Sequence, residues 1–342
     1  MSEYLDSTVN QEVYPLVSIV ILNYNGLAFL GSYLNECLSS VIRSDYPNLE
    51  VIFVDNGSTD GSVEFVEKNF KFMVKVIKCL CNLGWSEGFN TGIRASKGKY
   101  IILLSNDMTV HPNLLKSVVR FLESNPEVGL VGFKRLVQGT INLLDGIGSN
   151  LYLCGRVKPV GTNEVDRGQY DHEIDDLDFM GGAMALRRET LQQVGLFDPD
   201  FKIFSEDVDL CFRIRKKGYK TVYLHNAVIW HRAHSTLVGI DSKGQYLEYM
   251  SYKNRIRCNI IHFTFRRLFA SFFIDFVWFL MAKSASKELL LEAYLWNFKH
   301  VSTAFKKRLQ YGPSPPFNCK YPVLPFNFND FKRRITSILR LR

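Results

Sequence analysis

From residue 17 onward, short runs rich in β-branched residues alternate with segments of helical periodicity. Such alternation is typical of βαβ units, in which crossover helices join parallel strands. The apolar runs occupy residues 17–23, 49–55, 72–78, 99–105 and 128–133. Helical patterns lie between them, at roughly 30–43, 60–69, 86–96 and 112–124. We therefore expect an α/β fold, with a mostly parallel sheet flanked by helices and suited to binding a nucleotide.

The rest of the chain follows other patterns. Residues 134–178 are rich in Gly, Asn and Asp, which predicts loops with short strands before regular structure resumes at 179. After about residue 241, Tyr, Arg, Lys and Phe recur at helical spacing, which predicts two or three helices up to roughly 308. The expected divisions are an N-terminal tail at 1–14, an α/β domain at 15–240, a helical extension at 241–310 and a Pro-rich, basic tail at 311–342.

Charge and cysteine content restrict the partners and the compartment. Forty-two Lys and Arg residues against 34 Asp and Glu give a net charge of +8, which suits phosphorylated ligands, anionic membranes or nucleic acid. The seven cysteines are odd in number and mostly lie in apolar runs, which favours a reducing cytosol. The polar N-terminus lacks a secretory signal. The apolar stretch at 268–282 contains Asp275 and is shorter than the ~18 residues of a spanning helix. A cytoplasmic location is expected.

Polar residues gather after the predicted strands, where open α/β sheets bind their ligands. The motifs are NYNG (23–26), VDNGSTDGS (54–62), NLGWSEGFNTG (82–92) and LLSND (103–107). Turn chemistry gives no reason for Asp55 and Asp107 to end two strands. Asp55 suits a base or a ribose hydroxyl, and Asp107 suits a hard divalent ion. Because GxGxxG and GxxxxGK motifs are missing, a metal is the simplest way to hold phosphates.

Gly84, Gly88 and Gly92 recur at a spacing of four residues. For Gly88 and Gly92, we favour close packing of a helix on the sheet over ligand contact. Asn82 and Gly84 precede this helix, so their backbone amides could face a base or a sugar.

The segment FSEDVDLCFRIRKKGY (204–219) crowds three carboxylates into four positions and then becomes basic. Acidic residues stabilise the first turn of a helix and cations the last, so a helix with Ser205 as its N-cap explains the charge order. It does not explain why an acidic turn follows FMGGAMAL (179–186) and precedes IWHRAH (229–234). Whether the acids have a function must therefore be decided from the rest of the chain.

Together these motifs resemble the family-2 glycosyltransferases of GT-A fold, in particular the rhamnosyltransferase-like branch. The resemblance rests on VSIVILNYNG, VDNGSTDGS, NLGWSEGFNTGI, LLSNDMTV, FMGGAMALRRETLQQVGLFDPDF and FSEDVDLCFRIRKKGY, in this order across residues 17–240. It implies an enzyme that moves a sugar, with inversion, from a nucleoside-diphosphate sugar to a hydroxyl of a saccharide or lipid-linked acceptor. The domain at 15–240 would be catalytic.

The resemblance also assigns residues to roles. Asp207 becomes the catalytic base with Glu206 as its neighbour, while Asp209 is structural and FDPDF fixes the acidic helix. Ser105-Asn106-Asp107 replaces a DxD motif, so Asp107 would bind Mn²⁺ or Mg²⁺ together with His231, and His234 is a weaker candidate. Asn106, Gly181 and Gly182 would face the donor sugar or diphosphate. Nucleotide-binding residues are expected at Asn23, Asn25, Asp55, Asn56, Gly57, Ser58, Asn82 and Gly84.

Two basic segments contain many apolar residues: 262–283, which is rich in Phe, and 331–342, in which Ile and Leu alternate with cations. They predict peripheral binding to an anionic membrane at its cytoplasmic face. Packing on the catalytic domain, or against a second subunit in a homodimer, is the alternative. No nucleic-acid partner is expected.

Two other functions stay open. A nucleotidyltransferase would carry a cationic Gly-rich loop after its first strand, and an epimerase a GxxGxxG motif with a Tyr-xxx-Lys pair. Tyr249 and Lys253 have that spacing, but NYNGLAFL lacks both loop types. A catalytically inactive nucleotide-sugar binding protein is the second alternative, against which the retention of Asp55, Asp107 and Asp207 argues.

Overall fold

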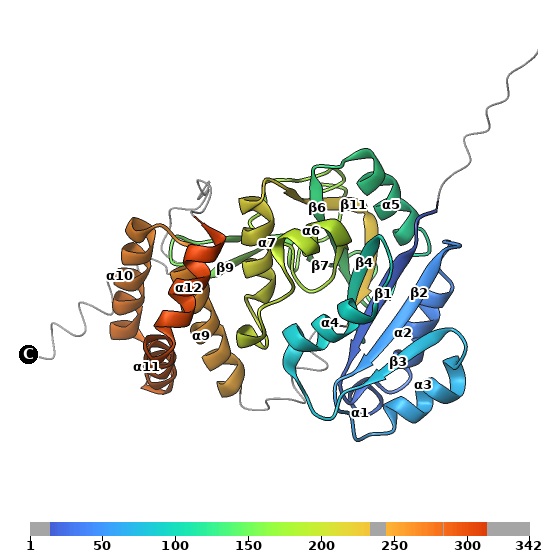
Figure 1. Cartoon of the computed structure of the whole chain (residues 1–342), viewed down its shortest axis with the longest axis horizontal. Coiled ribbons are helices and arrows are strands. Elements are labelled where there is room, and N and C mark those ends of the chain that lie inside the picture. The colour runs from blue at the N-terminus through green and yellow to red at the C-terminus, as the bar shows by residue number, and fades with distance from the viewer. Residues whose placement is uncertain (1–13, 233–243, 283, 313–342) are drawn as a thin grey trace, which may run out of the picture.

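The computed structural model describes residues 14–232, 244–282 and 284–312. A mixed nine-stranded sheet forms its centre, in the order β3-β2-β1-β4-β10-β6-β11-β5, with β7 paired to β6 (Figure 1). The strands of this sheet are β1 (Val17–Asn23), β2 (Leu49–Asp55), β3 (Val74–Lys78), β4 (Tyr100–Ser105), β5 (Met108–Val110), β6 (Val128–Val137), β7 (Leu144–Gly146), β10 (Met184–Arg187) and β11 (Lys220–His231). A two-stranded sheet joins β8 (Gly148–Leu151) to β9 (Val157–Val160).

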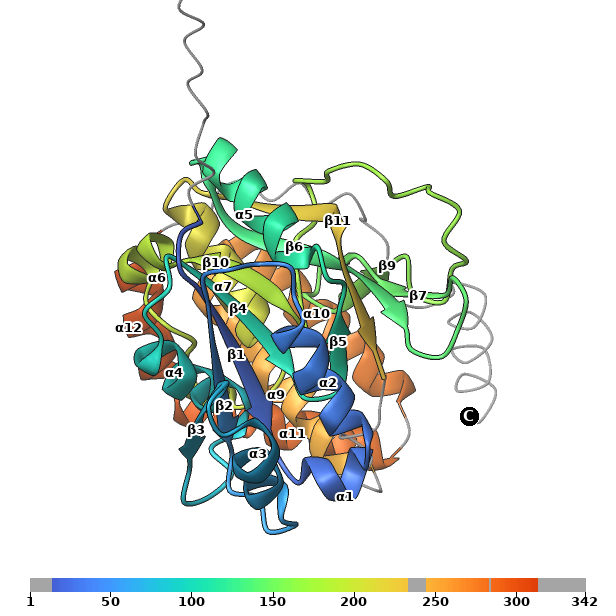
Figure 2. The ribbon, with the colours of Figure 1, turned by 90° about the vertical axis from the view of Figure 1, so that its right-hand side faces the viewer.

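Helices cover both faces of the large sheet. Figure 2 shows α2 and α5 in front of the sheet, with α9 and α11 behind it. The helices are α1 (Gly26–Leu30), α2 (Tyr33–Ile42), α3 (Ser62–Phe70), α4 (Gly84–Ala95), α5 (Leu114–Ser124), α6 (Arg188–Val194), α7 (Glu206–Lys216), α9 (Gln245–His262), α10 (Phe265–Met281), α11 (Ser284–Lys299) and α12 (Val301–Tyr311), with a 3₁₀ turn, η1, at Pro199–Phe201.

The N-terminal half of the sheet is parallel, as the strand-helix alternation predicts. β1 pairs in parallel with β2 and β4, and its register places Asn23 beside Asp55 and Leu22 beside Ser105. Successive side chains of a strand point to opposite faces, so β1 supplies both cores. Ile19 and Ile21 join the cluster under α2 and α5, while Val20 packs with α4 on the other face. The polar strand ends therefore meet at one edge.

Several sequence-based expectations require correction. The helix expected at 30–43 is α2, which begins only at Tyr33 because the chain turns at Gly31 with a φ of 59°, and the short helix α1 before that turn was not expected. Between residues 244 and 312, the part of this region that the structure describes, four helices form instead of two or three. Ser205 precedes α7 with a φ of 66°, and its side chain caps no backbone N–H. Expectations for residues 1–13 and for the tail from 313 lie outside the described residues.

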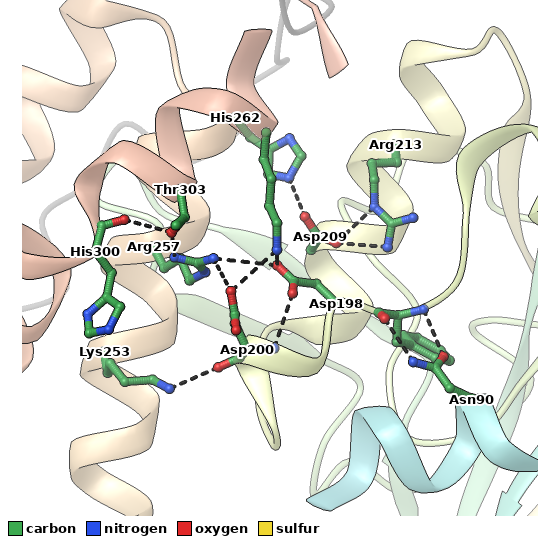
Figure 3. A network of polar contacts seen from close by, with 12 residues as sticks. Asn90, Asp198, Asp200, Asp209, Arg213, Lys253, Arg257, His262, His300 and Thr303 are labelled. Carbon is green, nitrogen blue, oxygen red and sulfur yellow. Dashed lines mark hydrogen bonds and ion pairs between the residues drawn. The ribbon is translucent and has the colours of Figure 1, made fainter. Parts of the chain in front are cut away.

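Polar contacts attach the C-terminal helices to the α/β domain (Figure 3). Arg257 of α9 pairs with Asp200 in the turn before α7, and Lys253 donates to the Asp200 carbonyl at 3.0 Å. Lys307 of α12 pairs with Asp198 in the same turn. The FDPDF segment is thus held by α9 and α12, and Asn90 of α4 donates to its Phe197 carbonyl at 2.9 Å.

The glycines of α4 allow this helix to lie close to the sheet. A Cβ at Gly92 would come within 2.2 Å of Val20 Cγ1 and 2.9 Å of Val54 Cγ2. One at Gly88 would come within 2.6 Å of Leu22 Cδ1. Close packing, which we favoured for both positions, is confirmed.

We predict that Gly92→Ala lowers the free energy of unfolding by ~1–3 kcal/mol, because the added methyl overpacks the helix–sheet contact. Alanine's better helix propensity offsets this by only ~1 kcal/mol. Urea unfolding measures the change, and Thr91→Ala, on a half-buried position of the same helix, should differ from wild type by under ~0.5 kcal/mol. A Gly92→Ala variant as stable as wild type would contradict the packing argument.

Candidate active site

A cavity of about 940 Å³ lies beyond the carboxyl ends of β1, β2 and β4. The first turn of α7, the turn between β8 and β9, and α9 complete its wall. The predicted site residues that line it are Asn56, Asn82, Gly84, Asn106, Asp107, Gly181, Gly182, Glu206, Asp207 and His231. Segments more than a hundred residues apart in sequence therefore converge here.

The other predicted residues lie behind the cavity wall. Asp55 is 2% exposed, and its carboxylate accepts from Asn23 Nδ2 and from the Ser58 backbone N–H, both at 2.9 Å. Asn25 donates its backbone N–H to Ser58 Oγ at 2.8 Å. Asn106 donates to Asn23 Oδ1 at 2.6 Å, which links this group to the cavity. These side chains tie together the three loops that follow β1, β2 and β4.

The loops after β2 and β3 meet around Asn56. Its Nδ2 donates to Asn82 Oδ1 at 3.1 Å, and its Oδ1 accepts from the Leu83 N–H at 2.9 Å. Gly57 has a φ of 82°, and a Cβ there would lie 2.7 Å from the Cys81 carbonyl carbon. Only glycine fits such a close backbone approach. Asn56 and Asn82 are consequently fixed at the floor of the cavity.

A second polar group lies where β5, β7 and β11 meet. β11 pairs with β5, placing His231 opposite Met108 and its Nε2 3.4 Å from Asp107 Oδ2. His231 Nδ1 contacts Asp145 Oδ2 at 3.1 Å, and the same oxygen accepts from Arg135 Nε at 3.1 Å. Asp107 Oδ1 is buried without a hydrogen-bond partner among the described residues.

The charges of this group perturb one another. Burial alone would lower the pKa of His231, but hydrogen bonds with Asp107 and Asp145 raise it to about 9. Burial opposes ionisation of Asp145, yet the contacts with His231 and Arg135 hold its pKa below the usual value. Within the described ranges, no three His, Cys, Asp or Glu side chains form a metal cluster. Asp107 and His231 can offer one carboxylate and one imidazole.

The acidic end of α7 faces the cavity. Asp207 Oδ1 accepts from the Val208 N–H at 2.8 Å, and its Oδ2 lies 2.4 Å from where a Cβ on Gly181 would be. Gly181 therefore makes room for the carboxylate, and Arg135 donates to its carbonyl at 2.6 Å. Gly182 adopts a φ of 84°.

Burial changes the proton affinity of both acids. It raises the pKa of Asp207 to about 6, although a hydrogen bond from the backbone opposes the shift. Burial and the neighbouring Asp207 carboxylate raise the pKa of Glu206 well above its usual value. Glu206 Oε2 also has no hydrogen-bond partner in the described chain. Glu206 is therefore harder to ionise than an ordinary glutamate, while Asp207 can exchange a proton near neutral pH.

Sequence analysis missed the residue that positions this turn. Phe204 and Ser205 adopt φ values of 70° and 66°, which non-glycine residues rarely do. Asn254 Nδ2, from α9, donates to the carbonyls of Phe201, Ile203 and Phe204 at 2.6–2.9 Å. The sequence predicted only that Asn254 lies in a helix, and gave no sign of its contacts with the turn before α7. Asp145 and Arg135 were missed because their segment lacks strand periodicity. His234 lies outside the described residues.

A comparison with protein families identifies the chain's relatives. Residues 18–195, just over half of the 342, match the model of glycosyl transferase family 2. The chain therefore belongs to that family of glycosyltransferases. The motifs that indicated the resemblance lie largely within the matched range.

Named relatives agree with this assignment. An uncharacterized glycosyltransferase of Haemophilus influenzae is 32% identical over 34% of this chain and 36% of its own length. Another, RP339 of Rickettsia prowazekii, is 28% identical over 70% of this chain and 71% of its own length. A poly-β-1,6-N-acetyl-D-glucosamine synthase of Staphylococcus epidermidis is 24% identical over 63% of this chain and 52% of its own length. The match thus spans about a third to two-thirds of these relatives.

Solved structures confirm the GT-A fold. GalNAc-T7 with UDP, GalNAc and Mn²⁺ has a TM-score of 0.58 at 18% identity, over 74% of this chain and 49% of its own. The mannosyltransferase PcManGT of Pyrobaculum calidifontis, in complex with GDP-Man and Mn²⁺, has a TM-score of 0.52 at 17% identity, over 96% of this chain and 81% of its own.

Proposed function

We propose that this chain transfers a sugar, with inversion, from a nucleoside-diphosphate sugar to a hydroxyl of a saccharide or lipid-linked acceptor. One observation carries the proposal: Asp207 and the Asp107–His231 pair line the same cavity from different elements. Neighbours of the same fold hold UDP or GDP-Man, which supports this donor class. The rhamnosyltransferase-like resemblance favours a deoxyhexose among the donors to be tested.

Asp207 is proposed as the general base. Its carboxylate takes the proton of the acceptor hydroxyl, whose oxygen then bonds to the anomeric carbon as the bond to the diphosphate oxygen breaks. A base suits this step when its pKa lies near the working pH and it is ionised before the reaction. A pKa of about 6 meets both conditions at neutral pH. Glu206, whose pKa is raised by burial and by the Asp207 carboxylate, is proposed to stabilise the turn.

Asp107 and His231 fit a divalent metal, for which Mn²⁺ and Mg²⁺ are both proposed. The orphan Asp107 Oδ1 supplies a hard anionic oxygen, the kind of ligand that suits Mn²⁺ and Mg²⁺, and the His231 imidazole is proposed as an additional nitrogen ligand. A bound metal would neutralise charge on the leaving diphosphate. Arg135 and Asp145 orient His231, and Asn106 holds the loop that carries Asp107. Asp55, Asn56 and Asn82 are proposed to shape the nucleotide side of the cavity.

The division into a catalytic domain at 15–240 and a helical extension at 241–310 is likewise proposed. The extension completes the site, because Tyr246, Ser251, Tyr252 and Arg255 of α9 line the cavity. Removing it would therefore open the cavity to solvent.

Helix α10 offers a surface for membrane binding. Phe265, Phe269, Phe273, Phe276 and Leu280 are each more than half exposed and recur at helical spacing. Arg266 is exposed beside them. No helix of the described residues has the length and apolarity to cross a bilayer. We propose that this face lies in the interface of an anionic membrane.

Asp207→Asn is expected to lower turnover by about 10²–10⁴, the range for loss of a general base. Because protonation also disables the base, wild-type turnover should fall as the pH drops below about 6. The variant's residual rate should lack that dependence. Product formation from a nucleotide-sugar panel measures both, and Asp45→Asn, an exposed carboxylate, serves as control. Wild-type turnover in Asp207→Asn would exclude Asp207 and direct attention to Glu206.

Mn²⁺ or Mg²⁺ is expected to raise the affinity for the matching nucleoside diphosphate, and Asp107→Ala should abolish the increase. The reason is the loss of the carboxylate proposed to hold the ion. Calorimetric titration with metal and with chelator measures the difference. Equal affinity under both conditions in the wild type would indicate a metal-independent enzyme, in which His231 and Arg232 neutralise the leaving group.

The protein is expected to sediment with anionic liposomes at low salt and to be released at high salt. Phe269→Ser combined with Phe273→Ser should weaken sedimentation, because it removes apolar area from the interface. Phe72→Ser, which removes a 94% exposed phenylalanine outside α10, is the matched control and should have no effect. Truncation of residues 326–342 tests the basic tail. Equal sedimentation with neutral vesicles would instead support a dimer interface, detectable by analytical ultracentrifugation.

A further inference from the structure

The cavity contains a half-buried cation, two of whose nitrogens are fully buried, that the proposed chemistry does not use. Arg156 lies in the turn between β8 and β9 and lines the cavity. Its Nε and Nη2 atoms are buried and have no hydrogen-bond partner among the described residues. A buried guanidinium without acceptors is costly, because it has lost its water without gaining other hydrogen bonds. Such a group indicates a missing ligand.

The region around Arg156 carries more positive than negative charge. A second guanidinium, that of Arg255, lines the same cavity, and it pairs with Asp275 of α10 at 2.7 Å. Tyr294 donates to the same Asp275 oxygen at 2.6 Å. Burial, and next the charge of Arg255, lower the pKa of Arg156. Two neighbouring cations are thus matched by one carboxylate.

The turn is rigidly built around this side chain. Arg255 Nη1 and Asn259 Nδ2 both donate to the Cys154 carbonyl at 2.9 Å. Arg267 donates to the carbonyls of Tyr152 and Leu153. The guanidinium carbon of Arg156 lies 4.5 Å from the Trp278 ring centroid, which holds the plane of the group by a cation–π contact. Arg156 is therefore positioned before any ligand arrives.

We propose that Arg156, supported by Arg255, binds a phosphate group carried by the acceptor. This rests on the proposed transfer reaction and assigns the acceptor's class. A planar guanidinium donates two parallel hydrogen bonds to a phosphate, and these are stronger than neutral ones. The donor diphosphate is proposed to lie at Asp107, in the turn between β4 and β5, and at His231, the last residue of β11. Arg156 comes from the side formed by α9 and α10.

Helix α10 connects this site to the protein surface. Trp278 packs under Arg156, while Phe273 and Phe276 of the same helix are exposed. A phosphate linked to a lipid and a soluble phosphate would both satisfy Arg156. If the natural ligand is a lipid-linked phosphate, an alkyl chain on the phosphate should increase its affinity for the protein. If the natural ligand is soluble, the alkyl chain should make no difference.

Calorimetry with the full-length protein tests the proposal, with Mg²⁺ and the tightest-binding nucleoside diphosphate among UDP, GDP and dTDP filling the donor site. Inorganic phosphate and decyl phosphate are the probes. Arg156→Gln should weaken phosphate binding by about 10- to 100-fold, as expected for lost charge-assisted hydrogen bonds. Arg120→Gln, which removes an exposed cation of α5, should not. Tighter binding of decyl phosphate would identify a lipid-linked source, and equal binding a soluble one.

Thermal unfolding provides a second readout. Without phosphate, Arg156→Gln should melt at the wild-type temperature or above it, because an unpaired buried charge is removed. Added phosphate should raise the melting temperature of the wild type only. A markedly lower melting temperature in the variant would show a structural role and overturn the proposal. Unchanged phosphate binding, or a parallel loss of nucleoside-diphosphate affinity, would also overturn it.

Donor hydrolysis by the wild type, measured on the same samples, separates this proposal from the proposed function. Phosphate binding that depends on Arg156, without hydrolysis of any donor, would refute the transfer reaction and leave the phosphate site standing. Hydrolysis without phosphate binding would overturn the phosphate site alone.

Discussion

The fully buried Asp209 carboxylate fixes the helix on which the proposed active site depends. It pairs with Arg213 one turn later and accepts from His262 of α9 at 2.7 Å. Burial opposes its ionisation, but Arg213 and His262 hold its pKa far below the usual value. Burial lowers the pKa of His262 to about 4, so this imidazole is neutral at physiological pH. Helices α7 and α9 are thereby joined at the centre of the molecule (Figure 3).

This junction explains how a proposed catalytic acid and a structural acid can share one short segment. Asp209 pairs with Arg213 and contacts His262 of α9, whereas Asp207 lines the cavity and accepts from the Val208 backbone N–H. Asn254, two turns before His262, holds the strained residues just ahead of α7. The C-terminal helices therefore position the turn that carries the proposed base. Its loss would affect chemistry as well as stability.

The sequence allowed accurate prediction wherever local periodicity decides the structure. The strands at 17–23 and 49–55 have the predicted limits, because buried apolar runs have unambiguous ends at Asn23 and Asp55. Asp145, Arg135, Asn254 and Arg156 could not be found in this way. Their importance arises from tertiary contacts between segments that carry no strand or helix signal of their own, or from one face of a long helix. At Ser205 the local sequence misled the prediction. Serine favours capping a helix N-terminus, but the left-handed backbone of Ser205 leaves its side chain without a capping hydrogen bond.

The requirement for glycine at position 181 limits which residues of this site can change to alter donor-sugar preference. Position 181 adjoins the space where a donor sugar is proposed to lie, so it would be an obvious place to alter sugar preference. Any Cβ would nevertheless meet the Asp207 carboxylate before it met a sugar. Changes in donor choice, whether by natural drift or by laboratory selection, must therefore arise from other walls of the cavity.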